Sequence, residues 1–262
     1  MVKRATVVTW FACFLAFANA FSGTLREKFE QTYAVEKGGE VFLINSNGSV
    51  TVSSWDKNEV QVFAEKVVRS DRRGEAEEII KEIQIEVTHD GNYLKIKTDA
   101  PKFANRFWNA IFGDDVSVAV NYRLQVPQDL KLEVSNVNGS VEIAEISGEI
   151  RAISTNGRVE MTRCKGVVDV KTTNGAINVE LLEVTENPEM LFKTTNGSIT
   201  VVFPEELSAE IDASTTNGSI RTDFPITVQG EVSRRKLRGV INDGGGRIDM
   251  RTTNGSITIR QR

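Results

Sequence analysis

The chain has 262 residues, of which 32 are basic and 36 acidic, so its formal net charge at pH 7 is −4. A negative balance argues against nucleic acid as a partner, because phosphate binding needs a positive protein surface. One histidine and two cysteines are too few for a His/Cys metal cluster, and we expect neither a metal nor a cofactor. The length is ample for a sizeable core, as one elongated domain or two joined units.

Residues 1–20 are typical of an export signal. Lys3 and Arg4 give a positive start, and the apolar stretch 7–17 is too short to span a bilayer comfortably. The motif Ala18-Asn19-Ala20 matches an A-x-A cleavage site, so we expect a signal peptide at 1–20 and a mature chain beginning at Phe21. An uncleaved membrane anchor is the alternative. Cleavage would leave 30 basic against 36 acidic residues, a net charge of −6.

No stretch after the signal is apolar for long enough to cross a membrane. We therefore expect an exported protein that is periplasmic, extracellular or associated with the cell envelope. Cys164 would be its only cysteine, which excludes an intramolecular disulfide and leaves the fold to its core and backbone ladder. The position of Cys164 in the repeat points inward, which predicts a buried structural thiol.

The N-terminal β region, 21–122, contains one early copy of the repeat described below, beginning at Val41. A strand pair is predicted over 55–68 and an amphipathic helix over 74–83. Two further strands flank the turn signal at 89–92. We expect the helix to cover the open end of a stack of β-coils, which would otherwise expose unpaired edges.

An aromatic insertion at 101–115 interrupts this region. Its large side chains are Phe103, Phe107, Trp108 and Phe112. We interpret the insertion as a short helix or loop that packs on the body of the protein, since large exposed apolar patches are rare on monomers. The alternative makes these four aromatics the best candidate outside the repeats for contact with a partner.

Residues 123–262 are organised by a repeat that is continuous with the N-terminal region. Asn-Gly dipeptides recur seven times in the whole chain, six of them in this region, and four stand in the phrase TTNGAI or TTNGSI. Positions six and four before each Asn, and three and five after it, are apolar in almost every copy. This alternation is typical of strands with one buried face. The asparagines are Asn47, Asn138, Asn156, Asn174, Asn196, Asn217 and Asn254.

Glycines at nine-residue intervals, from Gly139 to Gly175, suggest units of 18 residues with two strands and two corners. We predict an all-β fold, a β-solenoid of such coils; the alternative is an antiparallel meander or sandwich in which each Asn-Gly closes a hairpin. Identical Thr-Thr-Asn columns favour the solenoid, because stacked Asn and Thr side chains can bond along a ladder. The asparagines from Asn138 to Asn254 are thus assigned a structural role at repeat corners.

Later copies carry insertions, at 186–188, at 203–204, at 224–225 and over the glycine-rich segment 234–246. A regular stack does not require them. They direct the search for function away from the repeat phrase and towards the insertions and the aromatic segment.

The helix leading into IQIEVTHDGNYLKIKTD, the segment VAVNYRLQVPQDLKLEVSNVNGSVEI and the TTNGSI repeats occur here in that order. Together they resemble the bacterial putative-adhesin family of exported β-repeat proteins, a domain of unknown function. The resemblance covers the chain from about Thr32 to the C-terminus. It implies a β-solenoid-like fold and an exported or envelope location, and it carries no catalytic residues to transfer.

No catalytic constellation is apparent. His89 lies in a predicted turn beside Asp90, and the acidic residues of the repeats are spread along strand surfaces (Glu142, Glu160, Asp169 and Glu180). We predict a non-enzymatic protein of the cell envelope, an adhesin or a surface binding or scaffold protein, with an envelope protein or a glycan as partner. The alternatives are a carbohydrate-active β-helix enzyme and a purely structural envelope factor. The Thr-Thr-Asn rows themselves could serve stacking, docking or the ordering of water, in that order of preference.

Overall fold

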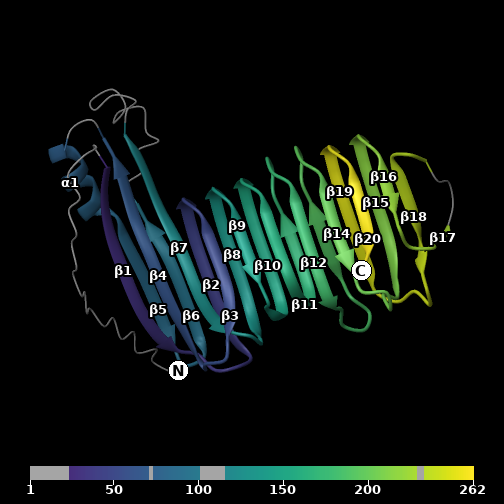
Figure 1. Cartoon of the computed structure of the whole chain (residues 1–262), viewed down its shortest axis with the longest axis horizontal. Helices are drawn as coiled ribbons and strands as arrows, with labels where there is room; N and C mark the ends of the chain where they lie inside the picture. The colour runs from purple at the N-terminus through teal and green to yellow at the C-terminus, as the bar shows by residue number, and fades with distance from the viewer. Residues whose placement is uncertain (1–23, 71–72, 101–115, 229–232) are drawn as a thin grey trace, which may run out of the picture.

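The computed structural model describes residues 24–70, 73–100, 116–228 and 233–262. The expected signal peptide and the aromatic insertion lie outside these residues. The described chain is all-β apart from one helix, α1 (Arg73–Glu82), and its strands stack into an elongated body with two opposite faces (Figure 1). The all-β, solenoid-like architecture predicted from the sequence is confirmed.

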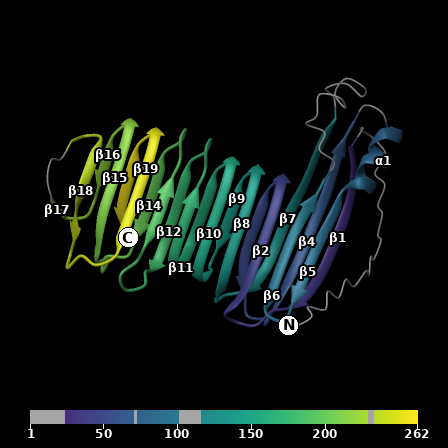
Figure 2. The same ribbon diagram turned by 180° about the vertical axis from the view of Figure 1, so that it is seen from behind.

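Face 1 is a mostly parallel set of strands that can be followed in Figure 2. In spatial order it contains β5 (Gln84–Asp90), β6 (Tyr93–Asp99), β2 (Gly39–Asn47), β8 (Leu130–Asn138), β10 (Ser147–Asn156), the second half of β11 (Val159–Lys171), β13 (Met190–Lys193), β19 (Arg247–Asn254), β15 (Ala209–Asn217), β18 (Lys236–Ile241) and β17 (Thr227–Val228).

Face 2 is built in the same way from the other arm of each coil. It contains β1 (Thr24–Ala34), β4 (Glu59–Arg69), β7 (Ser117–Pro127), β3 (Val50–Trp55), β9 (Val141–Ala144), the first half of β11, β12 (Ile177–Glu183), β14 (Ile199–Phe203), β20 (Ile257–Gln261) and β16 (Ile220–Thr222). All pairs between repeat copies are parallel, so Asn-Gly does not close a hairpin and the meander alternative does not describe the repeats.

The spatial order of the coils differs from their order in the chain. β19 and β20 lie between the copy at β13 and β14 and the copy at β15 and β16. The segment 223–246 makes this possible: β18 runs back antiparallel to β15 on its outer side, and the chain then re-enters the stack on the inner side of β15. Alignment of the copies on Asn-Gly gives no sign of this exchange.

The antiparallel strands at the N-terminal end differ in detail from the sequence-based prediction. The strand pair predicted over 55–68 is the end of β3 and a single strand, β4. His89 lies in β5, whereas it was predicted to lie in the turn that follows this strand. The helix packs against β1 and β4 and contributes Ala76, Ile79 and Ile80 to the core, and Ile83 follows directly after it.

The core runs between the two faces as a single cluster of buried side chains. It includes the apolar columns of every copy, for example Leu132, Ile150 and Val168, each with no exposed surface. Burial of one such side chain contributes roughly 1.5–3 kcal/mol. Since each column repeats from coil to coil, the apolar side chains of one coil pack against the same columns of the coils beside it.

The glycines of Asn-Gly occupy the tightest contact between coils. A Cβ atom on Gly197 would lie 2.0 Å from the carbonyl oxygen of Gly175, and one on Gly175 would lie 2.0 Å from that of Gly157. The φ angles of these three residues are not left-handed, so the requirement for glycine comes from close backbone approach and not from turn conformation.

Gly197→Ala should therefore lower the free energy of unfolding by about 3 kcal/mol, as overpacking of a rigid contact does. Gly74→Ala is the matched control, because a Cβ on Gly74 in α1 meets nothing within 4 Å. That control should leave stability unchanged or raise it by up to about 1 kcal/mol. Urea denaturation followed by circular dichroism measures both, and equal stability of the two variants would contradict the contact argument.

Candidate functional site

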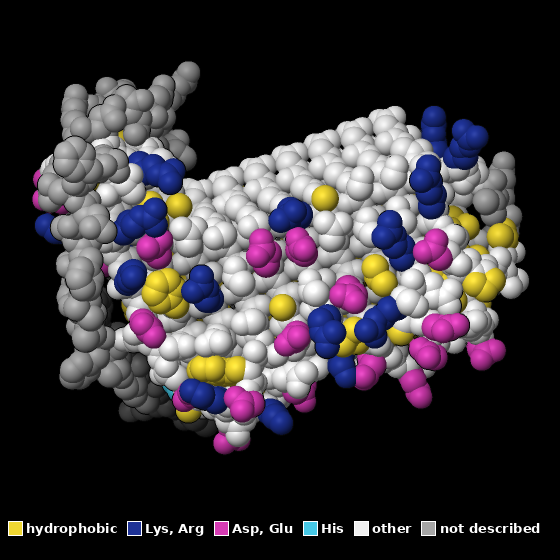
Figure 3. Space-filling view, in the orientation of Figure 1, with side chains coloured by type: hydrophobic (Ala, Val, Ile, Leu, Met, Phe, Trp, Pro, Cys, Tyr) yellow, Lys and Arg dark blue, Asp and Glu magenta, His cyan; other side chains and the backbone are white. Residues whose placement is uncertain are grey.

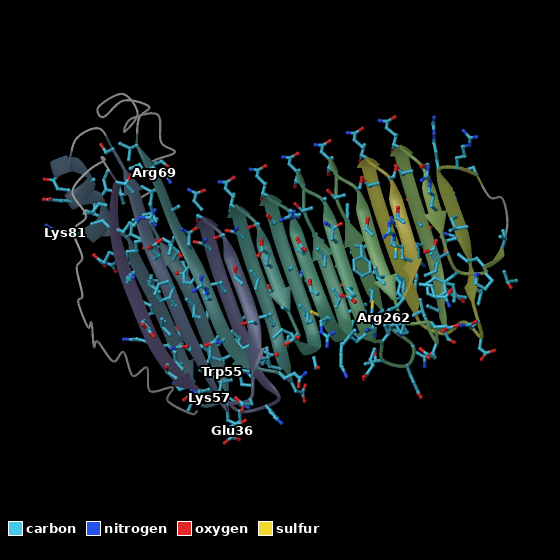
Figure 4. The ribbon with its side chains drawn as sticks, viewed as in Figure 1. Glu36, Trp55, Lys57, Arg69, Lys81 and Arg262 are labelled. Carbon is cyan, nitrogen blue, oxygen red and sulfur yellow. The ribbon has the colours of Figure 1, made fainter. Side chains whose placement is uncertain are left out.

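The corner that follows each face 1 strand carries a continuous ladder of asparagine side chains, here called the corner ladder. The Nδ2 atom of each Asn donates to the Oδ1 atom of the Asn in the preceding coil, at 2.7 Å for the pairs from Asn156 to Asn217 and at 2.5 Å for Asn138. Spatially the ladder runs through Asn47, Asn138, Asn156, Asn174, Asn196, Asn254 and Asn217. Its amides stand in a regular row along the upper corner in Figure 4.

The first threonine of Thr-Thr-Asn belongs to the inside of this corner. Thr194 is buried, and its Oγ1 donates to the carbonyl oxygen of Gly175 at 2.9 Å. The same bond joins Thr172 to Gly157, Thr252 to Gly197 and Thr215 to Gly255. These hydroxyls satisfy glycine carbonyls of the neighbouring coil, so this column has a structural explanation.

The second threonine has no such explanation. Thr173, Thr195, Thr253 and Thr216 are exposed, and their hydroxyls make no hydrogen bond to any residue that the structure describes. The phrase Thr-Thr-Asn thus divides into one buried structural residue, one free hydroxyl and one ladder amide.

The two columns should respond differently to removal of the hydroxyl. Thr194→Val leaves the partly buried carbonyl of Gly175 without this partner and should lower the free energy of unfolding by about 1–2 kcal/mol. Thr195→Val, the adjacent control, should change it by less than about 0.5 kcal/mol. Thermal or urea denaturation distinguishes them, and a larger loss for Thr195→Val would reverse the assignment of the columns.

The insertions of the later repeats meet at the opposite corner. Loops 183–189, 203–208 and 242–246 surround a pocket of about 480 Å³, here called the loop pocket. The Nδ2 atom of Asn242 donates to the carbonyl of Leu207 at 2.7 Å. A Cβ on Gly246 would lie 2.1 Å from backbone atoms of Asn187 and Pro188, so these loops are in close backbone contact. Three segments that are separate in the sequence thus form one surface.

The rim of the loop pocket is acidic. Carboxylates come from Glu183, Glu186, Glu206 and Asp243. Glu183 forms an ion pair with Lys165, while the other three are exposed and make no ion pair with a described residue. Among the described residues no group of three or more His, Cys, Asp or Glu is arranged to hold a metal ion. The carboxylates of this rim can accept hydrogen bonds and attract positive charge.

The remaining candidates from the sequence do not converge. The aromatic residues Phe103, Phe107, Trp108 and Phe112 lie outside the described residues. Glu142 and Glu160 are neighbours in register on face 2, whereas Asp169 lies on face 1 and accepts a bond from the backbone nitrogen of Leu191. Glu180 pairs with Arg262 at 3.8 Å. These four acids do not share one site.

His89 and Trp55 both make local contacts. The Nε2 atom of His89 lies 2.8 Å from the carbonyl oxygen of Ala34, and its ring meets Tyr33 edge-on at 5.5 Å. These contacts join β5 to the end of β1. The indole nitrogen of Trp55 donates to the carbonyl of Glu59 at 2.7 Å, with Lys57 over the ring (Figure 4).

Cys164 lies where β11 turns from face 2 to face 1. It is fully buried, and burial raises the pKa of its thiol. At neutral pH the thiolate is therefore scarce in the native protein, and iodoacetamide should alkylate Cys164 far more slowly than in urea-unfolded protein. Mass spectrometry of both reactions over pH 7 to 9 tests this, and rapid native labelling at pH 7 would mean an accessible thiol.

These observations describe a solenoid-like stack of β-repeats with one polar ladder and one loop pocket. A family model described as Toastrack DUF4097 matches residues 30–260, and the chain belongs to this family, whose function is unknown. The resemblance to the putative-adhesin family is confirmed. No curated protein matches the chain. No helix in the described ranges is long and apolar enough to span a membrane.

Similar solved structures include two that are named for adhesion and one that is named for lipid binding. A putative cell adhesion protein from Clostridium sporogenes is 13% identical, with 90% of this chain and 100% of that chain covered and a TM-score of 0.43. A putative adhesin from Bacteroides fragilis is 14% identical, with 90% and 97% covered and a TM-score of 0.42. A putative lipid binding protein from Parabacteroides distasonis is 9% identical, with 90% and 96% covered and a TM-score of 0.25.

Proposed function

We propose that the protein is an exported, non-enzymatic protein of the cell envelope that acts as an adhesin-like binding protein. The observation that carries this proposal is the convergence of the repeat insertions on the loop pocket. A regular coil stack does not require loops 183–189 and 203–208, yet both pack against the loop 242–246. Binding surfaces are commonly built from loops on a rigid scaffold.

The scaffold suits such a role because it is stiff. Coils are joined by backbone bonds, by the corner ladder and by a continuous core, so the loops of the pocket are held by strands on both sides. Pre-organised loops lose little conformational entropy when a partner binds. A partner with positively charged or amide groups fits the acidic rim, either an envelope protein or a glycan. The aromatics Phe103, Phe107, Trp108 and Phe112 remain a proposed second contact.

Retention on washed cell envelopes tests the pocket. The variant Glu186→Gln, Glu206→Gln, Asp243→Asn should be retained at least about tenfold less than the unmodified protein, as for loss of binding hot spots. The control Glu36→Gln, Glu78→Gln, Glu82→Gln removes the same charge at exposed positions far along the chain and should be retained normally. Equal retention of both variants would show that the loop pocket is not the binding surface.

The same protein can be tested for export and for the enzymatic alternative. Fractionation of cells expressing the full chain should find the protein outside the cytoplasm. Its intact mass should equal that of a chain that begins at Phe21. Incubation with envelope polysaccharide should release no soluble sugar. Cytoplasmic protein would contradict export, and sugar release would favour the carbohydrate-active enzyme. Loss of retention in Trp108→Ala, Phe112→Ala would support the aromatic contact.

A further inference from the structure

Face 1 carries a row of positive charges that the fold does not need. Lys171, Lys193 and Arg251 lie directly opposite one another on the consecutive parallel strands β11, β13 and β19. Ser214 continues the row on β15, and Lys236 follows it on β18. Neighbouring strands are about 4.8 Å apart, so like charges in register repel one another and destabilise a sheet. We call Lys171, Lys193, Arg251 and Lys236 the basic row.

The basic row is poorly neutralised. Lys171, Lys193 and Lys236 make no ion pair with any residue in the described ranges, and Arg251 meets only Asp249, at 3.4 Å. The next row of the same face shows the opposite pattern. Arg151 lies in register between Glu133 and Asp169, and Asp212 binds Arg238 at 2.6 Å. Charges therefore compensate one another in that row but not in the basic row.

Free polar groups lie beside the basic row, within β15 and β19 and just after the ends of β11 and β13. Two residues along, and so on the same side of the sheet, are the exposed threonines Thr173, Thr195, Thr253 and Thr216, whose hydroxyls have no partner among the described residues. The corner ladder follows. The repeat copies at β11, β13 and β19 thus each present a cation, a hydroxyl and an amide. The next copy presents the same three groups one strand spacing away.

The row ends in two further cations. The carbonyl oxygens of Arg234 and Arg235 accept hydrogen bonds from the backbone nitrogens of Ile220 and Thr215, both at 2.9 Å. These contacts hold both exposed arginines at the last rung, beyond Asn217. Figure 3 shows Lys and Arg side chains gathered at this end of the upper corner, while the rest of that corner is uncharged in the same view.

We propose that this surface binds an acidic polysaccharide that lies across the strands, along the stack. The carboxylates or sulfates of the polymer would pair with the basic row, and its sugar hydroxyls would bond the free threonines and ladder amides. One strand spacing is close to the advance of one sugar unit in an extended polysaccharide, so charges can match rung by rung. The row contains no aromatic side chain on which the bases of single-stranded nucleic acid could stack.

This site is distinct from the loop pocket, although both fit the proposed envelope role. The test uses purified protein and three probes: polygalacturonate for carboxylates, heparin for sulfates and dextran as a neutral polymer. Lys171→Gln, Lys193→Gln, Arg251→Gln should bind the two acidic polymers roughly tenfold more weakly, since each exposed ion pair contributes a factor of a few. Dextran should bind neither protein, and added salt should weaken binding by the unmodified protein.

The control Lys28→Gln, Lys37→Gln, Lys81→Gln changes the net charge equally at exposed positions outside face 1 and should alter affinity less than about twofold. Thr195→Val, Thr253→Val should weaken binding a few-fold without lowering the melting temperature. The basic-row variant should melt no lower than the unmodified protein, because like charges have been removed. The pocket variant described above should bind polygalacturonate normally. The proposal for the basic row and the proposal for the loop pocket can therefore fail independently.

Equal affinity of the basic-row variant and the unmodified protein for both acidic polymers would overturn the proposal. An equal loss of affinity in the control variant would also overturn the proposal, since net charge alone would then explain the effect. Single-stranded DNA that binds as tightly as polygalacturonate would show that the row recognises charge alone and not a sugar polymer.

Discussion

The closest contact between coils, where one Asn-Gly corner rests on the next, is the constraint on which the rest of the structure depends. At Gly157, Gly175 and Gly197 the backbones approach until no Cβ atom fits. This approach aligns the backbone bond from each glycine nitrogen to the asparagine carbonyl of the next coil, about 3.0 Å long at these corners. It also brings the asparagine amides within 2.7 Å of one another. Register, ladder and core columns therefore follow from one steric fact.

Because the corner fixes the register, the outward side chains of successive coils are aligned even where they do not attract one another. A side chain placed once per repeat becomes a row. The free threonines and three members of the basic row, Lys171, Lys193 and Arg251, follow this pattern, because they occupy the same position in their copies. The loop pocket uses the same scaffold differently, since it depends on departures from the repeat that happen to meet at one corner.

Much of this architecture could be predicted from the sequence, for reasons that lie in particular residues. The apolar columns around Leu132 and Val141 repeat with strand alternation, and the identity of the Thr-Thr-Asn columns favoured stacking over hairpins. The two threonines could not be told apart, because a turn phrase does not reveal which hydroxyl faces inward. The position of the last coil was also hidden, since Asn254 fits between Asn196 and Asn217 only by tertiary pairing. Lys171, Lys193 and Arg251 became a row only when spatial neighbours were known.

The displaced coil has a consequence for how the protein acquires its structure. β19 and β20 are synthesised after β15 and β18, yet they lie inside them. Coils cannot simply be added one after another as the chain emerges, because the place between β13 and β15 must stay open or be reopened. Such non-local pairing slows folding, since a long loop has to close before its contacts form. Until that happens, both neighbouring coils present unpaired strand edges to solvent, which are sites for association with other chains. The chain thus completes a coil inside the stack, next to its last coil, rather than adding one at its end.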